Sequence, residues 1–463
     1  MNRENLVLLP DPRADAIHVL HAATAIYTAE PVVNQLLELL QWPQQANQLI
    51  DPSCGDGMFL VRALERLLAV VDVHDDQALL RIQGWEIHPQ ACAEARQRIT
   101  TRLVLAGRSA TDAAQMALAM VHNRDFLTES PTTPSWDIVA GNPPYLRWLN
   151  VPQLLRDEYR SVVPGYAAMD LLYSFLDRCT RVLRLGGRIG FVTADRWLIN
   201  DQAANLRERL GQVVSISHLE RLDAKTAFYR PKQRHAGTPP RVHPVAVVLA
   251  SSAQQTTQPL TRQAIYPGVD ARRYAGLPTL GSIARVKLAP WLGTAGVFLV
   301  DAVTAATLPA EHLVPVVDAS DLENGQVRAA SRYAIRTKPG VQPPIAIQQH
   351  LQREMSRMSN RGKRTSPWMP PESFHHWDLD RPSLLVPRIA KSPQPYRIEA
   401  GRLPIGHNLS IVCETKTELE CVEGALHHPL ATSWIHDHAP RLEDGYFSLT
   451  APLLRRLPLV IPD

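Results

Sequence analysis

Short apolar runs alternate with amphipathic stretches between residues 46 and 250, and this rhythm constrains the fold more than any other feature of the chain. Each run has the length of a strand, and the stretch behind it has the period of a helix. Regular alternation of this kind indicates a parallel sheet with helices on both faces. We predict a Rossmann-like α/β fold whose mostly parallel sheet has seven strands. The expected strands are residues 48–51, 82–86, 120–122, 136–140, 188–193, 214–219 and 245–250.

The rhythm stops near residue 250, where a polar stretch, 251–258, has the composition of a linker. Beyond it the chain is rich in proline and irregular, with short strands and no repeated strand-helix unit. A chain of 463 residues also exceeds one ordinary domain. We therefore predict a first domain over residues 1–250 and a second domain, of α+β type, over residues 251–463.

Composition narrows where the protein works. No stretch of about 18 uncharged apolar residues occurs, so we expect no membrane span. Charged residues precede the first apolar run, which is not the pattern of a secretory signal. The five cysteines are scattered and form no CxxC pair, which is typical of the reducing cytosol and disfavours a structural zinc site. We expect a cytoplasmic protein that binds no metal.

The net charge of +4 is small but unevenly distributed. Residues 251–463 hold 23 Lys and Arg against 19 Asp and Glu, whereas the first 250 residues hold 26 of each. A basic excess confined to one part of the chain is consistent with a surface that faces nucleic acid. The stretch 353–364 is especially basic and is either a solvated surface loop or a segment that contacts phosphates. Its basic residues are Arg353, Arg357, Arg361, Lys363 and Arg364.

Polar groups follow the first four predicted strands at the point where each strand ends. The first is the loop 51–57 (Asp-Pro-Ser-Cys-Gly-Asp-Gly), whose glycines let the backbone approach a ligand at the start of a helix. At later strand ends, Glu86 can accept hydrogen bonds from ribose hydroxyls and Asp125 from an adenine amino group, while Phe126 can cover the adenine ring. Singly, each group could equally be a turn, a helix cap or a core residue. Together with Asn142 at the fourth strand end, they predict a nucleoside cofactor.

The fourth strand delivers the tetrapeptide Asn142-Pro143-Pro144-Tyr145. An amino group on an aromatic ring is a poor nucleophile, because its lone pair is delocalised into the ring. The Asn142 side-chain oxygen and the Pro143 carbonyl can accept from its two hydrogens, and both prolines restrict φ and so hold that carbonyl rigidly. Tyr145 offers a flat face for stacking. This pattern predicts methylation of a planar amine, and the alternative is a proline-rich turn behind a buried strand.

With these motifs in this order, the chain resembles the gamma-class, TaqI-type N6-adenine DNA methyltransferases with an NPPY motif. The segment 27–31 (Tyr-Thr-Ala-Glu-Pro) stands where that family has a related element, although Ala-Glu precedes the proline here. The resemblance implies a class I methyltransferase domain followed by a target-recognition domain, and S-adenosyl-L-methionine as cofactor. It implies that the cofactor is bound by Thr28, Asp51, Cys54, Gly55, Gly57, Glu86, Ile87, Asp125, Phe126 and Phe175.

The same resemblance implies base flipping, because a base inside a duplex must be extruded before its amine can react. Phe228, with Tyr229 as its alternative, would stack on the flipped adenine opposite Tyr145. The implied partner is double-stranded DNA, which would associate the protein with the nucleoid. The implied role is modification within a restriction-modification or related defence system. A restriction endonuclease, if the system has one, would be a separate protein.

Three other functions remain open from the sequence. Related tetrapeptides occur in enzymes that methylate guanine N2 in RNA or glutamine amides in proteins. The long region behind the first domain and the segment 27–31 in front of the glycine loop favour DNA over both. A non-catalytic DNA-specificity or scaffold protein is the third alternative, and the intact Asn142 and Tyr145 disfavour it.

Overall fold

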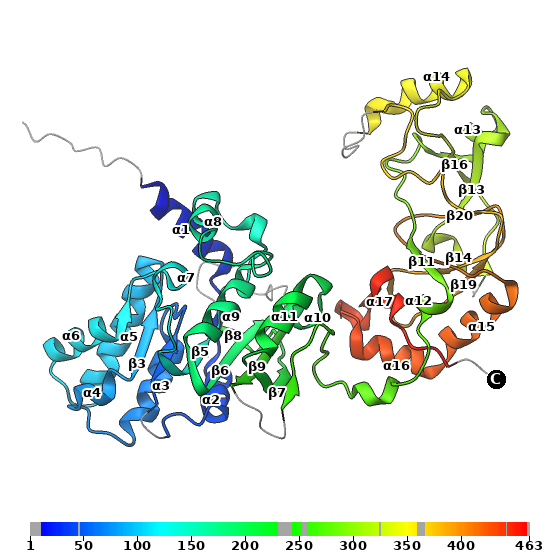
Figure 1. Ribbon diagram of the computed structural model, residues 1–463. Helices are drawn as coiled ribbons and strands as arrows, with labels where there is room; N and C mark the ends of the chain where they lie inside the picture. The colour runs from blue at the N-terminus through cyan, green and yellow to red at the C-terminus, as the bar shows by residue number, and fades with distance from the viewer. Residues whose placement is uncertain are drawn as a thin grey trace, which may run out of the picture. The chain divides into compact units, whose positions relative to one another are not determined.

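The computed structural model describes residues 11–44, 47–229, 243–251, 257–323, 326–358, 366–440 and 442–460. These residues form two compact units that divide between residues 268 and 269 (Figure 1). The sequence predicted a division at residue 250 instead. The catalytic and recognition roles assigned to the two domains stay predictions.

The unit boundary lies beyond residue 250 because the chain after the polar stretch still packs on the first unit. The short strand β10 (Gln258–Pro259) pairs antiparallel with β7 (Ser215–Arg221). Further on, the amide of Ile265 donates to the carbonyl of Leu198 at 2.9 Å, and both side chains belong to the same core. The polar composition of residues 251–258 therefore did not mark the end of the unit.

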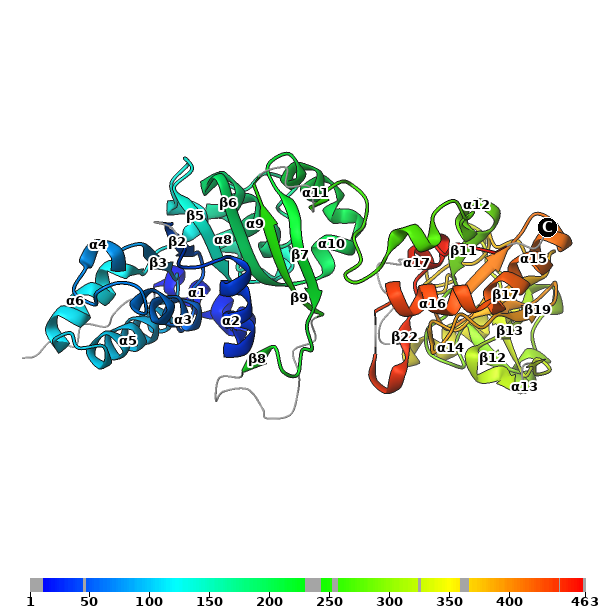
Figure 2. The ribbon, with the colours of Figure 1, turned by 90° about the horizontal axis from the view of Figure 1, so that it is seen from below.

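The sheet of the first unit has eight strands in the order β10-β7-β9-β6-β5-β2-β3-β4. Strand β9 runs antiparallel to its neighbours β6 and β7, while the four pairs from β6 to β4 are parallel (Figure 2). The predicted Rossmann-like, mostly parallel sheet is confirmed, and only the edge strand β10 was not expected. Its remaining strands are β2 (Leu49–Asp51), β3 (Ile82–Trp85), β4 (Val121–His122), β5 (Trp136–Gly141), β6 (Leu183–Ala194) and β9 (Pro244–Ala250).

Helices cover both faces of this sheet, because successive strand residues point to opposite sides. Ile50 and Val139 contribute to one core, and their neighbours Leu49 and Ile138 contribute to the other. The first core is closed by α1 (Pro12–Thr24), α8 (Gln153–Tyr159), α9 (Leu171–Val182), α10 (Arg196–Ile199) and α11 (Ala204–Gly211). The second is closed by α2 (Glu30–Leu39), α3 (Met58–Leu68), α5 (Pro89–Leu105) and α6 (Ala110–Met120), while α4 (Asp76–Leu79) and α7 (Phe126–Glu129) are short connections.

The second unit is of α+β type, as predicted, and contains two four-stranded sheets. One sheet consists of β11 (Arg285–Leu288), β21 (Leu409–Val412), β17 (Ser383–Val386) and β19 (Tyr396–Ile398), and the other of β12 (Leu299–Asp301), β16 (Arg332–Ile335), β13 (Leu313–Val317) and β20 (Leu403–Pro404). The ribbons β14 (Leu322–Glu323) with β15 (Gln326–Val327) and β18 (Ile389–Ala390) with β22 (Phe447–Ser448) are separate pairs. Its helices are α12 (Leu280–Ile283), α13 (Ala302–Ala305), α14 (Ile345–Glu354), α15 (Lys416–His427), α16 (Pro429–His438) and α17 (Ala451–Arg455).

Local sequence explains where the helices of the second unit begin. At α15, the Thr415 hydroxyl accepts from the amide of Glu418, whose carboxylate accepts in turn from the amide of Thr415. This reciprocal cap pairs two helix-end donors that would otherwise lack partners.

None of the helices in the described part of the chain is both long enough and apolar enough to cross a membrane.

Candidate active site

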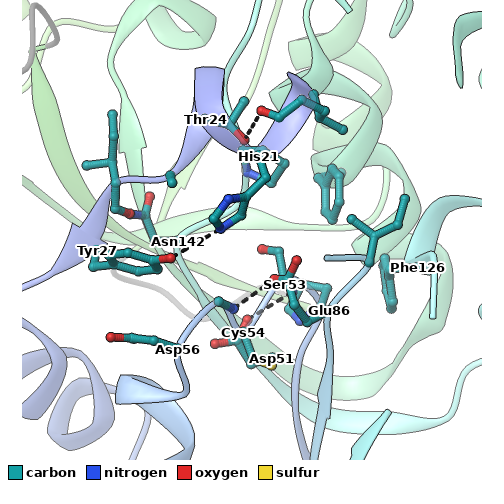
Figure 3. A pocket seen from close by; sticks show the side chains of 18 of the residues that line it. His21, Thr24, Tyr27, Asp51, Ser53, Cys54, Asp56, Glu86, Phe126 and Asn142 are labelled. Carbon is teal, nitrogen blue, oxygen red and sulfur yellow. Dashed lines mark hydrogen bonds between the residues drawn. The ribbon is translucent and has the colours of Figure 1, made fainter. Parts of the chain in front are cut away.

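A pocket opens at the carboxyl ends of the central strands of the first unit (Figure 3). This is the edge at which doubly wound sheets bind their ligands. The predicted site residues that line it are Thr28, Asp51, Cys54, Gly55, Glu86, Ile87, Asp125, Phe126, Asn142, Pro144 and Phe175. Gly57, Pro143, Tyr145 and Phe228 lie outside this lining.

The loop between β2 and α3 needs both of its glycines, for different reasons. Gly55 has φ of +54°, and a Cβ there would lie 2.8 Å from the Tyr27 ring. Gly57 has φ of +88° and caps α3, where a Cβ would meet that of Ala95 at 2.9 Å. The absence of a side chain at Gly55 therefore leaves room for the Tyr27 ring beside the pocket. The absence of a side chain at Gly57 lets α3 approach α5. Sequence reasoning placed Gly57 in the cofactor site, but the structure gives it a packing position.

Two buried carboxylates flank this loop. Glu86, at the end of β3, accepts from the amide of Gly55 at 2.9 Å and from that of His88 at 2.8 Å. Asp51, at the end of β2, accepts from the amide of Ser53 at 3.0 Å. Burial raises the pKa of both carboxyls, well above its usual range in Asp51, and the backbone donors partly offset the rise. The sheet edge therefore presents two acidic groups held in fixed orientations.

An aromatic pair lies at the other end of the pocket, beside Asp125. The rings of Phe126 and Phe175 stack with centroids 6.0 Å apart and an interplanar angle of 17°. Asp125 caps α7 by accepting from the amide of Leu127 at 3.0 Å. Burial raises the pKa of Asp125 to about 6, although the Tyr159 hydroxyl and the Leu127 amide act against the rise. A flat apolar wall next to a carboxylate acceptor suits a purine ring with an amino group.

Asn142 presents a defined acceptor to the pocket. Its side-chain nitrogen donates to the carbonyl of Ile26 at 2.8 Å. A carbonyl only accepts, so this contact fixes which way the amide points. The other end of the amide, Oδ1, is buried and has no hydrogen-bond partner among the described residues. The hydroxyls of Thr28 and Ser53 in the same pocket lining are buried and unpartnered in the same sense. Buried polar atoms normally have partners, so these three point to a polar ligand.

Residues 82–228 match the family described as Eco57I restriction-modification methylase. The chain carries an Eco57I-type restriction-modification methylase domain. Type II methyltransferase M.XhoI from Xanthomonas vasicola is 25% identical over 94% of this chain and 90% of its own length. Type II methyltransferase M.PaeR7I from Pseudomonas aeruginosa is 25% identical over 95% of this chain and 86% of its own length. The chain is therefore a methyltransferase, and type II methyltransferases are similar to it over nearly its whole length.

A solved structure supports the fold. The chain resembles the Type IIL restriction-modification enzyme MmeI, solved in complex with DNA, with a TM-score of 0.58 at 14% sequence identity. The match covers 96% of this chain but 65% of that one. At this identity the likeness concerns the fold alone.

The two predicted stacking residues of the methylase domain do not line the pocket. Tyr145 follows the prolines, but only 9% of its side chain is exposed and it packs in the core under α1, α8 and α9. Phe228 belongs to β8 (Phe228–Tyr229), which pairs with β1 (Tyr27–Thr28) so that Phe228 stands opposite Thr28. Its side chain is 7% exposed and packs in the core with α2 and α3. The structure therefore brings the cofactor residues and Asn142 together, but not this aromatic clamp.

Sequence reasoning missed the contribution of α1. His21 reaches the methylase pocket from this helix, with Nε2 3.2 Å from the Tyr27 hydroxyl and its ring stacked on His88 at 3.9 Å (Figure 3). Burial, then the neighbouring His88 and His18, lower the pKa of His21 to about 4. No motif marks this residue, since the two histidines of α1 match no ligand or catalytic spacing with the groups behind the strands. Tyr159 from α8 and Ser53 also line the pocket without having been predicted.

The predicted DNA-contacting residues of the second unit are only partly described. Arg353 and Arg357 are exposed near the end of α14, and both guanidinium groups lie 2.9 Å from the carboxylate of Glu354. This shared acid neutralises part of their charge. Arg361, Lys363 and Arg364 lie outside the described residues. Phosphate contact by this segment stays a prediction.

Proposed function

We propose that this methyltransferase transfers a methyl group from S-adenosyl-L-methionine to the exocyclic N6 of an adenine flipped out of double-stranded DNA. The observation that carries the proposal is the Asn142 amide, oriented by Ile26 so that Oδ1 is buried, unpartnered and part of the pocket. An oxygen in this state suits an incoming N–H group. The same pocket offers the acids and aromatic faces that a nucleoside cofactor requires.

The residues of the pocket fit S-adenosyl-L-methionine part by part. Glu86 would accept from the ribose hydroxyls, while Asp125 would accept from the adenine amino group beside Phe126 and Phe175. Asp51 would face the methionine amine, and the buried Thr28 hydroxyl is free to pair with the methionine moiety. When bound, this cofactor supplies an electrophilic methyl group.

The chain's own role in the reaction is to prepare the amine. Asn142 Oδ1 and the Pro143 carbonyl would accept from its two hydrogens and favour a pyramidal nitrogen whose lone pair is directed at the methyl donor. Pro143 and Pro144 restrict the backbone, so these acceptors need not reorganise during transfer. The amine proton becomes acidic only after transfer, so the site requires no strong general base. Tyr145 and Phe228 would stack on the base after a local rearrangement, since both are nearly buried.

We further propose that the second unit selects the DNA sequence and that the protein is the modification enzyme of a restriction-modification or related defence system. Similarity to the type II methyltransferases M.XhoI and M.PaeR7I supports this role, as does the likeness to MmeI, which was solved in complex with DNA. They also favour DNA over RNA guanine or a protein amide as the acceptor. A restriction endonuclease would be a separate partner.

A test of the proposal is to measure which class of macromolecule receives labelled methyl groups. The purified protein is incubated with radiolabelled S-adenosyl-L-methionine and with duplex DNA, RNA and protein in parallel, with Asn142→Ala as the matched variant. Label is expected on DNA alone and is expected to disappear with the variant, while cofactor binding persists. Label on RNA or protein but not on DNA would overturn the proposal, and label unaffected by Asn142→Ala would overturn the role of the amide.

A further inference from the structure

The turn behind the tetrapeptide presents an apolar side chain to solvent. Leu149, in the middle of the 3-10 turn Trp148–Asn150, is 82% exposed. Met169 is 50% exposed, and the carbonyl of Met169 accepts from the amide of Trp148 at 3.1 Å, so the two apolar residues come from adjoining segments. Single exposed leucines are common on surfaces, but Leu149 lies four residues after Tyr145, and Met169 belongs to the segment hydrogen-bonded to the same turn.

Main-chain contacts hold this turn in place. The amide of Leu171 donates to the carbonyl of Leu146 at 2.8 Å. The backbones of Arg147 and Asp170 pair in an isolated antiparallel β-bridge. Asp170 is buried, caps α9 and pairs with Arg196 at 2.7 Å. The exposure of Leu149 is therefore not the consequence of a loose loop.

The turn also borders the candidate active site. The ring centroids of Trp148 and Tyr159 are 6.4 Å apart. Tyr159 lines the pocket together with Leu171. Pro144, in the tetrapeptide itself, is part of the same lining. The turn begins six positions after Asn142 in the chain, so it adjoins the segment that carries the acceptor for the target amine.

We propose that Leu149 and Met169 form an apolar wedge that enters the DNA base stack where the target adenine has left it. The proposal rests on the proposed function, because it requires a flipped base. Proteins that unstack DNA commonly insert leucine or methionine side chains between bases, where apolar surface leaves water. A rigidly held apolar side chain beside the receiving pocket meets this requirement.

A cation beside the wedge fits the same partner. Arg147 is exposed, and among the described residues its guanidinium takes part in no hydrogen bond or ion pair that would neutralise it. Only Trp148 separates it from Leu149 in the chain. A free arginine next to an intercalating side chain is suited to a phosphate that flanks the opened step.

Substitution of Leu149, read on two DNA substrates, tests the wedge. The first is an unmethylated duplex that contains the sequence in which the enzyme methylates adenine. The second differs only by an abasic site opposite the target adenine. Leu149→Ala is expected to lower kcat/KM about tenfold on the paired duplex, because extrusion loses its support. On the abasic duplex, where no base pair opposes extrusion, the loss should shrink to about threefold or less. Leu149→Met should keep activity on both.

Leu185→Ala is the matched control, because Leu185 is 94% exposed and lies near the start of β6, at the edge of the sheet away from the pocket. It should leave both rates unchanged, and equal melting temperatures would show that both alanine variants are folded. An equal loss on both substrates, or no loss with Leu149→Ala, would overturn the wedge. If the unsubstituted protein methylates neither duplex, the proposed function itself fails.

Discussion

The side-chain amide of Asn142 donates to the backbone carbonyl of Ile26 across 2.8 Å, and this contact joins the end of β5 to the segment between α1 and β1. It leaves the Asn142 oxygen buried, oriented and without a partner among the described residues. A segment 116 residues upstream thereby fixes the acceptor that the chemistry needs.

Replacing Asn142 by aspartate should separate binding from catalysis. A carboxylate cannot donate to Ile26, so one of its oxygens would face that carbonyl and the acceptor would lose its orientation. We expect transfer to fall about 100-fold or more, as when one oriented polar group is removed from other active sites. Cofactor affinity, measured by calorimetry, should change about threefold or less. A comparable loss of affinity and rate would mean that Asn142 serves the cofactor instead.

Replacing Gly141 by alanine should damage the site from its floor. A Cβ at this position would lie 2.5 Å from Asp51 Oδ1, and both residues are buried in neighbouring strands. We expect a loss of roughly 1–3 kcal/mol in the free energy of unfolding, as for other overpacked cores, together with weaker cofactor binding. Gly165→Ala is the control, because nothing lies within 4 Å of a Cβ there. Urea unfolding of both variants measures the difference, and equal stabilities would contradict the packing argument.

Cofactor affinity should depend on pH through Asp125. Burial raises the pKa of this carboxyl to about 6 in the folded protein, so it becomes protonated as the pH falls through that value. The ionised form is the better acceptor for an adenine amino group, and affinity should therefore drop about tenfold between pH 7 and pH 5. Asp125→Asn should bind more weakly at pH 7 and should flatten this profile. An unchanged profile in the variant would assign the titration to another group.

Stability should fall in mild acid because of His21. The pKa of His21 is lowered to about 4 in the folded protein, whereas a histidine in the unfolded chain titrates near 6.5. The unfolded chain thus binds this proton more readily, and the free energy of unfolding decreases as the pH drops from about 6.5 toward 4. His21→Gln should reduce this slope, while His74→Gln, at an exposed site, should not. Urea unfolding at pH 7.5 and pH 5 provides the comparison.

Much of the fold and site could be predicted from the sequence, because parallel strands bring their carboxyl ends to one edge. Glu86, Asp125 and Asn142 lie in three different segments of the chain, yet each follows a strand of the same sheet and they line one pocket. The predicted strands were therefore enough to predict that these three residues lie close together.

Groups outside this rule could not be placed in the same way. His21 comes from a helix that precedes the sheet, and its approach to the pocket depends on tertiary packing. Phe228 was expected at the pocket from the family resemblance, but β8 pairs with β1 and the ring of Phe228 packs in the core. The unit boundary was missed because β10 and Ile265 return to the first unit.

The identity of the methylated atom tests the central claim most directly. Duplex DNA treated with the protein and S-adenosyl-L-methionine is digested to nucleosides, which are separated and identified by mass spectrometry. The account predicts N6-methyladenine as the new base, present with the unsubstituted protein and missing with Asn142→Ala. Methylation of cytosine, or of any position other than adenine N6, would contradict it.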